Sequence, residues 1–99
     1  MAYKVEFSRS ALRHLQGFSA ADRSLIVQGI ESHLVYQPLV ETRNRKLLRP
    51  NPLAAWELRI GRLRVFYEVP SDEPDQVHIL AIGWKDGNRF FIDGEEIIL

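Results

Sequence analysis

The pattern of residues 55 to 69 constrains the fold more than any other part of the chain. Apolar and polar residues alternate over Ala55–Ile60 and again over Leu63–Val69, with only Gly61-Arg62 between them. A period of two is typical of a strand with one buried face, and a two-residue connection that contains glycine is typical of a tight turn. The segment therefore predicts an antiparallel hairpin, and other parts of the chain must cover its apolar face.

Two helical segments are expected before this hairpin. Residues 2–7 alternate like a strand, and the following leucines at helical spacing predict a short helix over 9–17. Ser19 is a suitable N-cap for a second helix from about 20 to 36. That helix should end before Pro38, because proline disfavours helical geometry in the residue that precedes it. Helices early in the chain and strands late favour helices packed on one face of a sheet.

The rest of the chain completes an α+β fold. Residues 38–54 are expected to form an ordered loop, and Gln76–Gly83 a central strand because its apolar run is nearly continuous. The last residues predict a small hairpin about Asp93-Gly94, a pair typical of a type I′ turn. The predicted order is β-α-α-β-β-β with a C-terminal hairpin: two N-terminal helices on a small antiparallel sheet. Residues 1–99 suit a single domain.

Composition narrows the possible chemistry. The chain has no cysteine, which excludes disulfides, thiol catalysis and cysteine-ligated zinc. His14, His33 and His78 fall in three different predicted elements, so we expect no metal site and no metal cofactor. No apolar run reaches the roughly 18 residues that a membrane span needs, and the N-terminus reads as a strand rather than a signal peptide. We therefore expect a cytoplasmic protein with no membrane partner.

The charge of the chain is zero in total but uneven in distribution. Residues 43–64 hold seven basic residues against Glu57 alone, a net charge of +6, whereas residues 65–99 hold two basic and eight acidic residues, a net charge of −6. Local charge acts over roughly 8 Å at physiological salt, so the basic block favours a surface that binds polyanions. The alternative is that the two blocks neutralise each other across the sheet.

Two arginines of the predicted hairpin are the main candidates for chemistry. Alternation places Arg59 on the face of its strand opposite to the apolar residues. Arg64 is expected on the same face of the next strand. Neighbours across two strands lie about 5 Å apart, so the two guanidinium groups can converge on one anion. The alternative is that they form ordinary surface salt bridges with Glu57 and Glu68.

Several segments, in their order along the chain, resemble the RelE/ParE toxin superfamily of type II toxin–antitoxin systems. They are the strands WELRIGRLRVFYEV, the segment VHILAIGWK, the loop from Pro38 to Leu47 and the tail NRFFIDGEEIIL. The strand that carries Arg64, Val65, Phe66 and Tyr67 is the most specific of these. The resemblance covers nearly the whole chain and implies helices packed on a small antiparallel sheet.

The resemblance also implies a function and a set of residues. RelE-type members cut mRNA in the ribosome without a metal and stop translation, and basic side chains stabilise the charge of the transition state. By resemblance, Arg59, Arg64 and Lys85 are the expected catalytic residues. The expected RNA-binding residues are Arg43, Arg45, Lys46 and Phe91, and the expected partners are the ribosome, mRNA and a cognate antitoxin, which Trp84 and Phe90 would contact.

Two positions depart from the RelE-type pattern and keep other functions open. Glu57 stands where active nucleases often have lysine. Phe91 falls near the position where RelE-type toxins have a tyrosine, and phenylalanine cannot take part in proton transfer. Tyr67 is no substitute, because alternation directs it toward the core. ParE-type members inhibit DNA gyrase instead of cutting RNA, and this target is the main alternative. A weakened toxin that mainly binds its antitoxin is the other.

Overall fold

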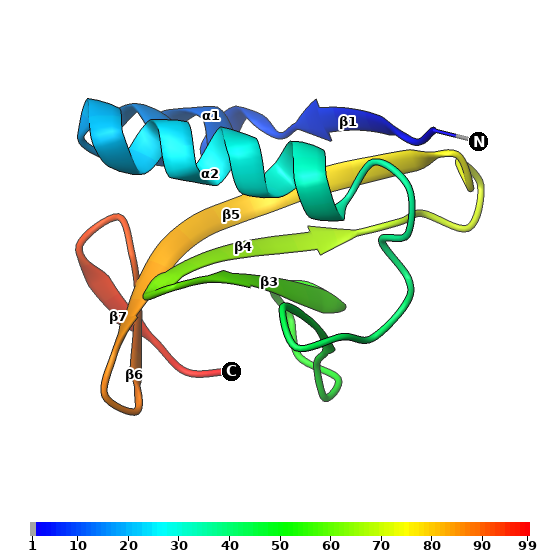
Figure 1. The fold of residues 1–99 in the computed structure, drawn as a ribbon. Coiled ribbons are helices and arrows are strands. Elements are labelled where there is room, and N and C mark those ends of the chain that lie inside the picture. The colour runs from blue at the N-terminus through cyan, green and yellow to red at the C-terminus, as the bar shows by residue number, and fades with distance from the viewer. Residues whose placement is uncertain (1) are drawn as a thin grey trace.

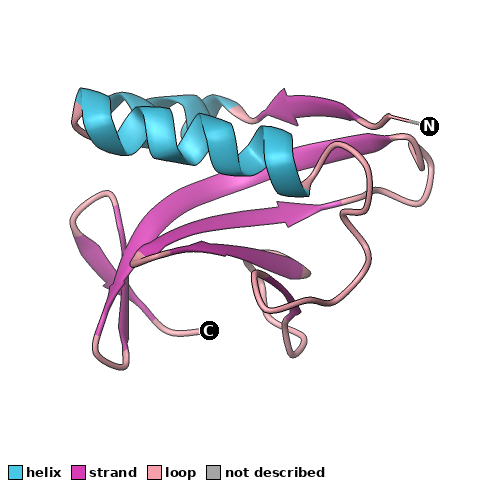
Figure 2. Ribbon diagram, in the orientation of Figure 1, coloured by secondary structure: helices cyan, strands magenta, loops and turns pink. Residues whose placement is uncertain are grey.

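The computed structural model describes residues 2–99 and consists of two helices and one seven-stranded sheet (Figures 1 and 2). The expected α+β class is confirmed. The elements in chain order are β1 (Lys4–Phe7), α1 (Arg9–Gln16), α2 (Ala20–His33), β2 (Arg45–Leu47), β3 (Trp56–Ile60), β4 (Leu63–Glu68), β5 (Gln76–Asp86), β6 (Arg89–Ile92) and β7 (Glu95–Ile97).

Serine caps begin both helices. The Oγ of Ser8 accepts a hydrogen bond from the backbone N–H of Ala11 at 3.0 Å, and the Oγ of Ser19 accepts one from Asp22 at 3.1 Å. Helix α2 ends at His33, three residues before the expected end. The earlier end has a physical reason, because a guanidinium group from Arg45 binds the carbonyl of His33 and so satisfies the last turn.

The sheet has the order β2-β3-β4-β5-β6-β7, and all of these neighbours are antiparallel. Strand β1 is the exception, since it pairs in parallel with the first half of β5. The second half of β5 pairs with β6, and the turn of the β6–β7 hairpin at Asp93-Gly94 lies beside α1 (Figure 1). Neither helix within residues 2–99 is long and apolar enough to cross a membrane.

The structure differs from the expected boundaries in two further places. The expected loop 38–54 contains the short strand β2, which pairs with β3. Strand β5 continues three residues beyond Gly83 because the backbone of β6 pairs with this extension. Gly83 permits the pairing, since a Cβ at this position would overlap the backbone carbonyl of Phe91.

The two faces of the sheet pack against different parts of the chain. The inner face carries Leu58, Val65 and Tyr67, which form the main core with side chains from both helices. We call the opposite side the outer face, and its buried centre is Phe66 with Ala81. The loop before β3 and the C-terminal tail cover part of the outer face, so it is not simply a solvated surface.

A β-bulge decides which residues of β5 reach the outer face. Phe66 pairs with Ala81 but Tyr67 pairs with Ile79, which leaves Leu80 as an extra residue in β5. Val77 and Ile79 belong to the inner core before the bulge, whereas Ile82 belongs to it afterwards. The phase of alternation therefore changes at Leu80.

Candidate functional site

Arg59 and Arg64 are direct cross-strand partners on the outer face, and both approach one carboxylate. The Nε of Arg59 donates to Oε2 of Glu57 at 2.7 Å, and the Nε of Arg64 lies 3.7 Å from Oε1 of the same residue. The side chain of Glu57 is 1 % exposed, against 44 % for Arg59. The two arginines thus converge on a single anion, as their spacing predicts, and that anion is a side chain of the protein itself.

Backbone carbonyl groups fix the position of the Arg64 guanidinium. Its Nη1 donates to the backbone carbonyls of Gly61 at 2.6 Å and Leu63 at 2.9 Å, which fixes the guanidinium beside the β3–β4 turn. Burial lowers the pKa of Arg64, while Glu57 raises it and Arg59 lowers it further. An arginine remains a cation despite such a shift. Arg64 therefore places a fixed positive charge beneath the outer face.

Lys85 lies on the same face as the two arginines. The register pairs Arg64 with Gly83, and Lys85 follows two residues later along β5. Its backbone N–H donates to the carbonyl of Arg62 at 2.8 Å, and its Nζ lies 5.7 Å from the ring centroid of Phe90. Phe90 in turn packs edge-on against Phe66. The three residues expected to be catalytic thus share the outer face near the β3–β4 turn.

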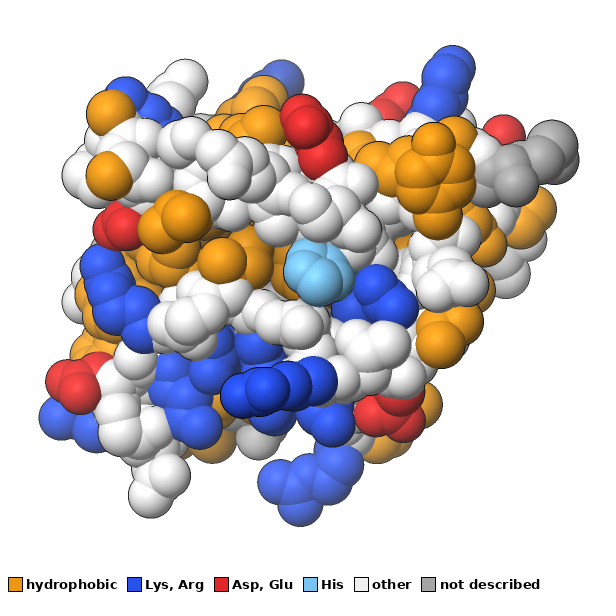
Figure 3. Space-filling view, in the orientation of Figure 1, with side chains coloured by type: hydrophobic (Ala, Val, Ile, Leu, Met, Phe, Trp, Pro, Cys, Tyr) orange, Lys and Arg blue, Asp and Glu red, His pale blue; other side chains and the backbone are white. Residues whose placement is uncertain are grey.

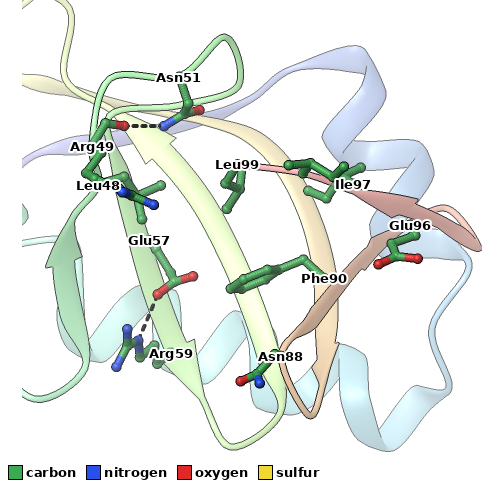
Figure 4. Close-up of a pocket in the computed structure, with 11 residues that line it drawn as sticks. Leu48, Arg49, Asn51, Glu57, Arg59, Asn88, Phe90, Glu96, Ile97 and Leu99 are labelled. Carbon is green, nitrogen blue, oxygen red and sulfur yellow. Dashed lines mark hydrogen bonds and ion pairs between the residues drawn. The ribbon is translucent and has the colours of Figure 1, made fainter.

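A cavity of about 340 Å³ opens on the outer face beside Glu57 and Arg59 (Figure 4). Arg49 and Asn51 border it from the loop before β3, and the C-terminal residues border it from the opposite side (Figure 4). Its lining mixes charged, amide and apolar groups: Leu48, Arg49, Asn51, Glu57, Arg59, Asn88, Phe90, Glu96, Ile97, Ile98 and Leu99. Such a lining offers cationic donors next to a flat aromatic ring.

The three basic residues expected to contact RNA from the loop have different environments. Arg43 is exposed, and Lys46 is partly exposed and pairs with Glu57 across β2 and β3. Arg45 is 6 % exposed, and its guanidinium donates to the carbonyls of Val40 at 2.8 Å and His33 at 2.9 Å. The donors of Arg45 hold the loop against α2 and do not face solvent.

The aromatic residues of the C-terminal hairpin are divided between the two sides. Phe91 stacks on Trp84 with ring centroids 5.5 Å apart, and Trp84 meets Phe18 edge-on at 6.2 Å. These rings lie on the side of the hairpin opposite to Phe90, because successive residues of β6 face opposite ways. The structure therefore does not bring Phe91 together with the three basic residues, and it separates Trp84 from Phe90.

The ion pairs of the described residues do not join the basic block to the acidic block. The acidic residues of the tail that form ion pairs within residues 2–99 use Arg13 and Arg89, which lie outside the block. Arg62 pairs with Asp22 of α2. Lysine and arginine side chains gather in the lower half of Figure 3, where β3 and the preceding loop lie. The ion pairs do not support mutual neutralisation of the basic and acidic blocks.

Sequence reasoning missed one feature of this site. Arg49 and Asn51 border the cavity, and their position beside β3 depends on a loop conformation that no periodicity reveals. Tyr67 is fully buried as expected, and its hydroxyl donates to the carbonyl of Pro38 at 2.6 Å. Burial raises the pKa of Tyr67 well above its usual range.

In the described residues, no group of three or more His, Asp or Glu side chains is arranged to hold a metal.

Comparison with known proteins finds a likeness among solved structures. No protein-family model matches the chain, and no curated protein matches its sequence. Among solved structures, a chain in the crystal structure of the toxin–antitoxin complex RelBE2 from Mycobacterium tuberculosis has a similar fold. The TM-score is 0.72 and the sequence identity is 25 %, and the match covers 86 % of this chain and 100 % of the other.

Proposed function

The chain has the RelE-like fold of the RelE/ParE toxins, and on that premise we propose that it is the toxin of a type II toxin–antitoxin pair. We propose further that it acts in the cytoplasm as a metal-independent endonuclease that cuts mRNA on the ribosome. The observation that carries the proposal is that Arg59, Arg64 and Lys85 share the outer face near the β3–β4 turn, where Arg59 borders the cavity. Clustered cations of this kind suit a phosphodiester substrate.

Each basic residue has a distinct part in the proposed reaction. The ribose 2′-hydroxyl gives up its proton to solvent water and its oxygen attacks the adjacent phosphorus to form a 2′,3′-cyclic phosphate. The bond to the leaving 5′-oxygen breaks, and negative charge develops on the phosphoryl oxygens. Arg59 at the rim binds these oxygens, and Arg64 stabilises them through its fixed charge. Lys85 stabilises or protonates the leaving oxygen. Arg43 and Lys46 bind the RNA backbone outside the reacting group.

A cognate antitoxin is the proposed protein partner. The similar solved structure is that of a toxin–antitoxin complex, and the partly exposed Trp84 and Phe90 supply aromatic surface for such a contact. Because these two side chains lie on opposite sides of the hairpin, one straight helix cannot cover both. We therefore propose that the antitoxin contacts the hairpin from two sides.

Primer extension on a defined mRNA in a purified translation reaction tests the nuclease proposal. We expect cuts that follow the codon phase, need the ribosome and disappear in Arg59→Ala and Lys85→Ala, whereas naked RNA in EDTA should stay intact. Arg9→Ala is the matched control, because it removes one exposed positive charge from the helical layer. Uncut message with the unchanged protein, or equal loss of cutting in the control, would count against the proposal.

A protein target such as DNA gyrase is the second candidate, and one observation favours it. Glu57 neutralises part of the arginine pair, and Phe91 faces away from it, so the outer face has a weaker set of groups for cutting RNA. A supercoiling assay with purified gyrase tests this function. Inhibition together with intact message would establish it, and unchanged supercoiling at micromolar protein would remove it.

A further inference from the structure

Glu57 occupies the position that an oxoanion would take between the two arginines. Its carboxylate is bound by Arg59 at 2.7 Å and lies under the cavity, which reaches it. A carboxylate with two oxygens and a phosphate group with more oxygens are recognised by the same planar donors of arginine. The protein therefore carries its own ligand in the one place where two guanidinium groups meet.

The fit between Glu57 and Arg64 is incomplete. Both the Oε1 of Glu57 and the Nε of Arg64 are buried and make no hydrogen bond, although they lie only 3.7 Å apart. A buried donor and acceptor that remain unpaired are unfavourable, because each has lost its hydrogen bonds to water. Such an arrangement leaves one donor available to a ligand that reaches deeper or offers another oxygen.

From this geometry we infer that Glu57 is a resident counter-ion that limits the binding of phosphate-class oxoanions at Arg59 and Arg64. The ligand class follows from the donors: two guanidinium groups, with Arg49 at the rim of the same cavity. A phosphate binds there only when the Glu57 carboxylate moves aside. The inference goes beyond the proposed function, since it holds whether the phosphate belongs to RNA or is free in solution.

Titration with inorganic phosphate at constant ionic strength tests the inference. We expect weak binding by the unchanged protein and at least about tenfold tighter binding by Glu57→Gln, since removal of a charge about 4 Å from the anion has a large effect at protein-like dielectric constants. Glu68→Gln is the matched control, because it removes an equal charge from the adjacent strand β4. Equal affinities in all three proteins would overturn the inference.

A second titration, with a short single-stranded oligoribonucleotide, distinguishes the two sources of phosphate. A larger gain for the oligonucleotide in Glu57→Gln identifies nucleic acid as the natural source, and a larger gain for inorganic phosphate identifies the free anion. Absence of mRNA cutting by both the unchanged protein and Glu57→Gln would refute the nuclease function and leave these affinities interpretable. The two ideas can therefore fail separately.

The unchanged protein provides a further measurement if Glu57→Gln does not fold. The Nε–H group of Arg59 gives its own signal in a ¹⁵N–¹H spectrum, and its hydrogen bond to Glu57 should slow exchange with water. We expect this signal to persist and to stay in place in millimolar phosphate. A signal that shifts progressively with phosphate would show that Glu57 does not restrict the site.

Discussion

Replacement of Arg45 by alanine tests whether a basic residue of the central block supports the fold or contacts a ligand. The guanidinium donates to the carbonyls of His33 and Val40 and is 6 % exposed. Arg45→Ala removes both hydrogen bonds and leaves the carbonyl of His33 at the end of α2 and that of Val40 in the following loop without this donor. We expect the variant to be less stable than the unchanged protein.

The size of the effect follows from these two contacts. Hydrogen bonds to a charged group contribute about 1.5 kcal/mol or more each, so the loss is about 3 kcal/mol. A domain of this length has a total stability of roughly 5–15 kcal/mol, and the loss is therefore a large fraction of it. The melting temperature should fall by about 12–24 °C, given about 4–8 °C per kcal/mol in small domains.

Urea unfolding followed by tryptophan fluorescence measures this change, since Trp56 is buried in the main core. Arg43→Ala is the matched control, because it removes the same side chain from an exposed position two residues earlier. The control should stay within about 0.5 kcal/mol of the unchanged protein. A stable Arg45→Ala variant that binds RNA more weakly would refute the structural role and restore the expected RNA contact.

Three further changes test other parts of the fold. Gly83→Ala should cost about 2 kcal/mol in urea unfolding, because the added Cβ overlaps a backbone carbonyl of β6; unchanged stability would mean that β6 can move away. Tyr67→Phe should cost about 1–2 kcal/mol, since it leaves the carbonyl of Pro38 without its donor, and no loss would show that water replaces the hydroxyl. Burial lowers the pKa of His14 from 6.5, so the unfolded state binds more protons than the folded state. The free energy of unfolding should therefore be highest above about pH 6.5 and fall below it. Urea unfolding at several pH values should show a smaller loss of stability at low pH in His14→Asn than in the unchanged protein. Asparagine keeps an acceptor for the backbone amide of β5, and equal losses in the two proteins would exclude His14 as the cause.

The sequence was sufficient for the parts of the fold that depend on local periodicity. The β3–β4 hairpin has its expected turn, and Arg59 and Arg64 are direct partners because a two-residue connection leaves only one register for the alternating pattern. The inward direction of Tyr67 follows from the same alternation. These features depend on residues close together in the chain.

The position of Lys85 could not be predicted in this way. Uninterrupted alternation from Val77 would direct Lys85 toward the helices, and only the extra residue at Leu80 brings it to the outer face. A bulge of this kind leaves no clear mark in an apolar strand, because both possible phases have apolar residues on each side. The common face of the three basic residues is thus a consequence of tertiary packing.

The net charge of the central segment overstates the charge that a polyanion would meet. Arg45 is buried against α2, Arg62 pairs with Asp22, and Glu57 binds the arginine pair of the outer face. The exposed or partly exposed cations of the segment are Arg43, Lys46, Arg49, Arg59 and Arg62, of which Arg59 binds Glu57 and Arg62 binds Asp22.

This distribution separates binding from chemistry. The accessible cations lie along the loop and the β3 rim, where they can attract a phosphate backbone over roughly a Debye length whatever happens at Glu57. The charge of the Arg64 guanidinium becomes available only when Glu57 no longer binds the pair. Salt should therefore weaken RNA binding through the loop cations, whereas replacement of Glu57 should act mainly on the step that involves the phosphate at Arg59 and Arg64. A variant of Glu57 that changed only the salt dependence of RNA binding would contradict this separation.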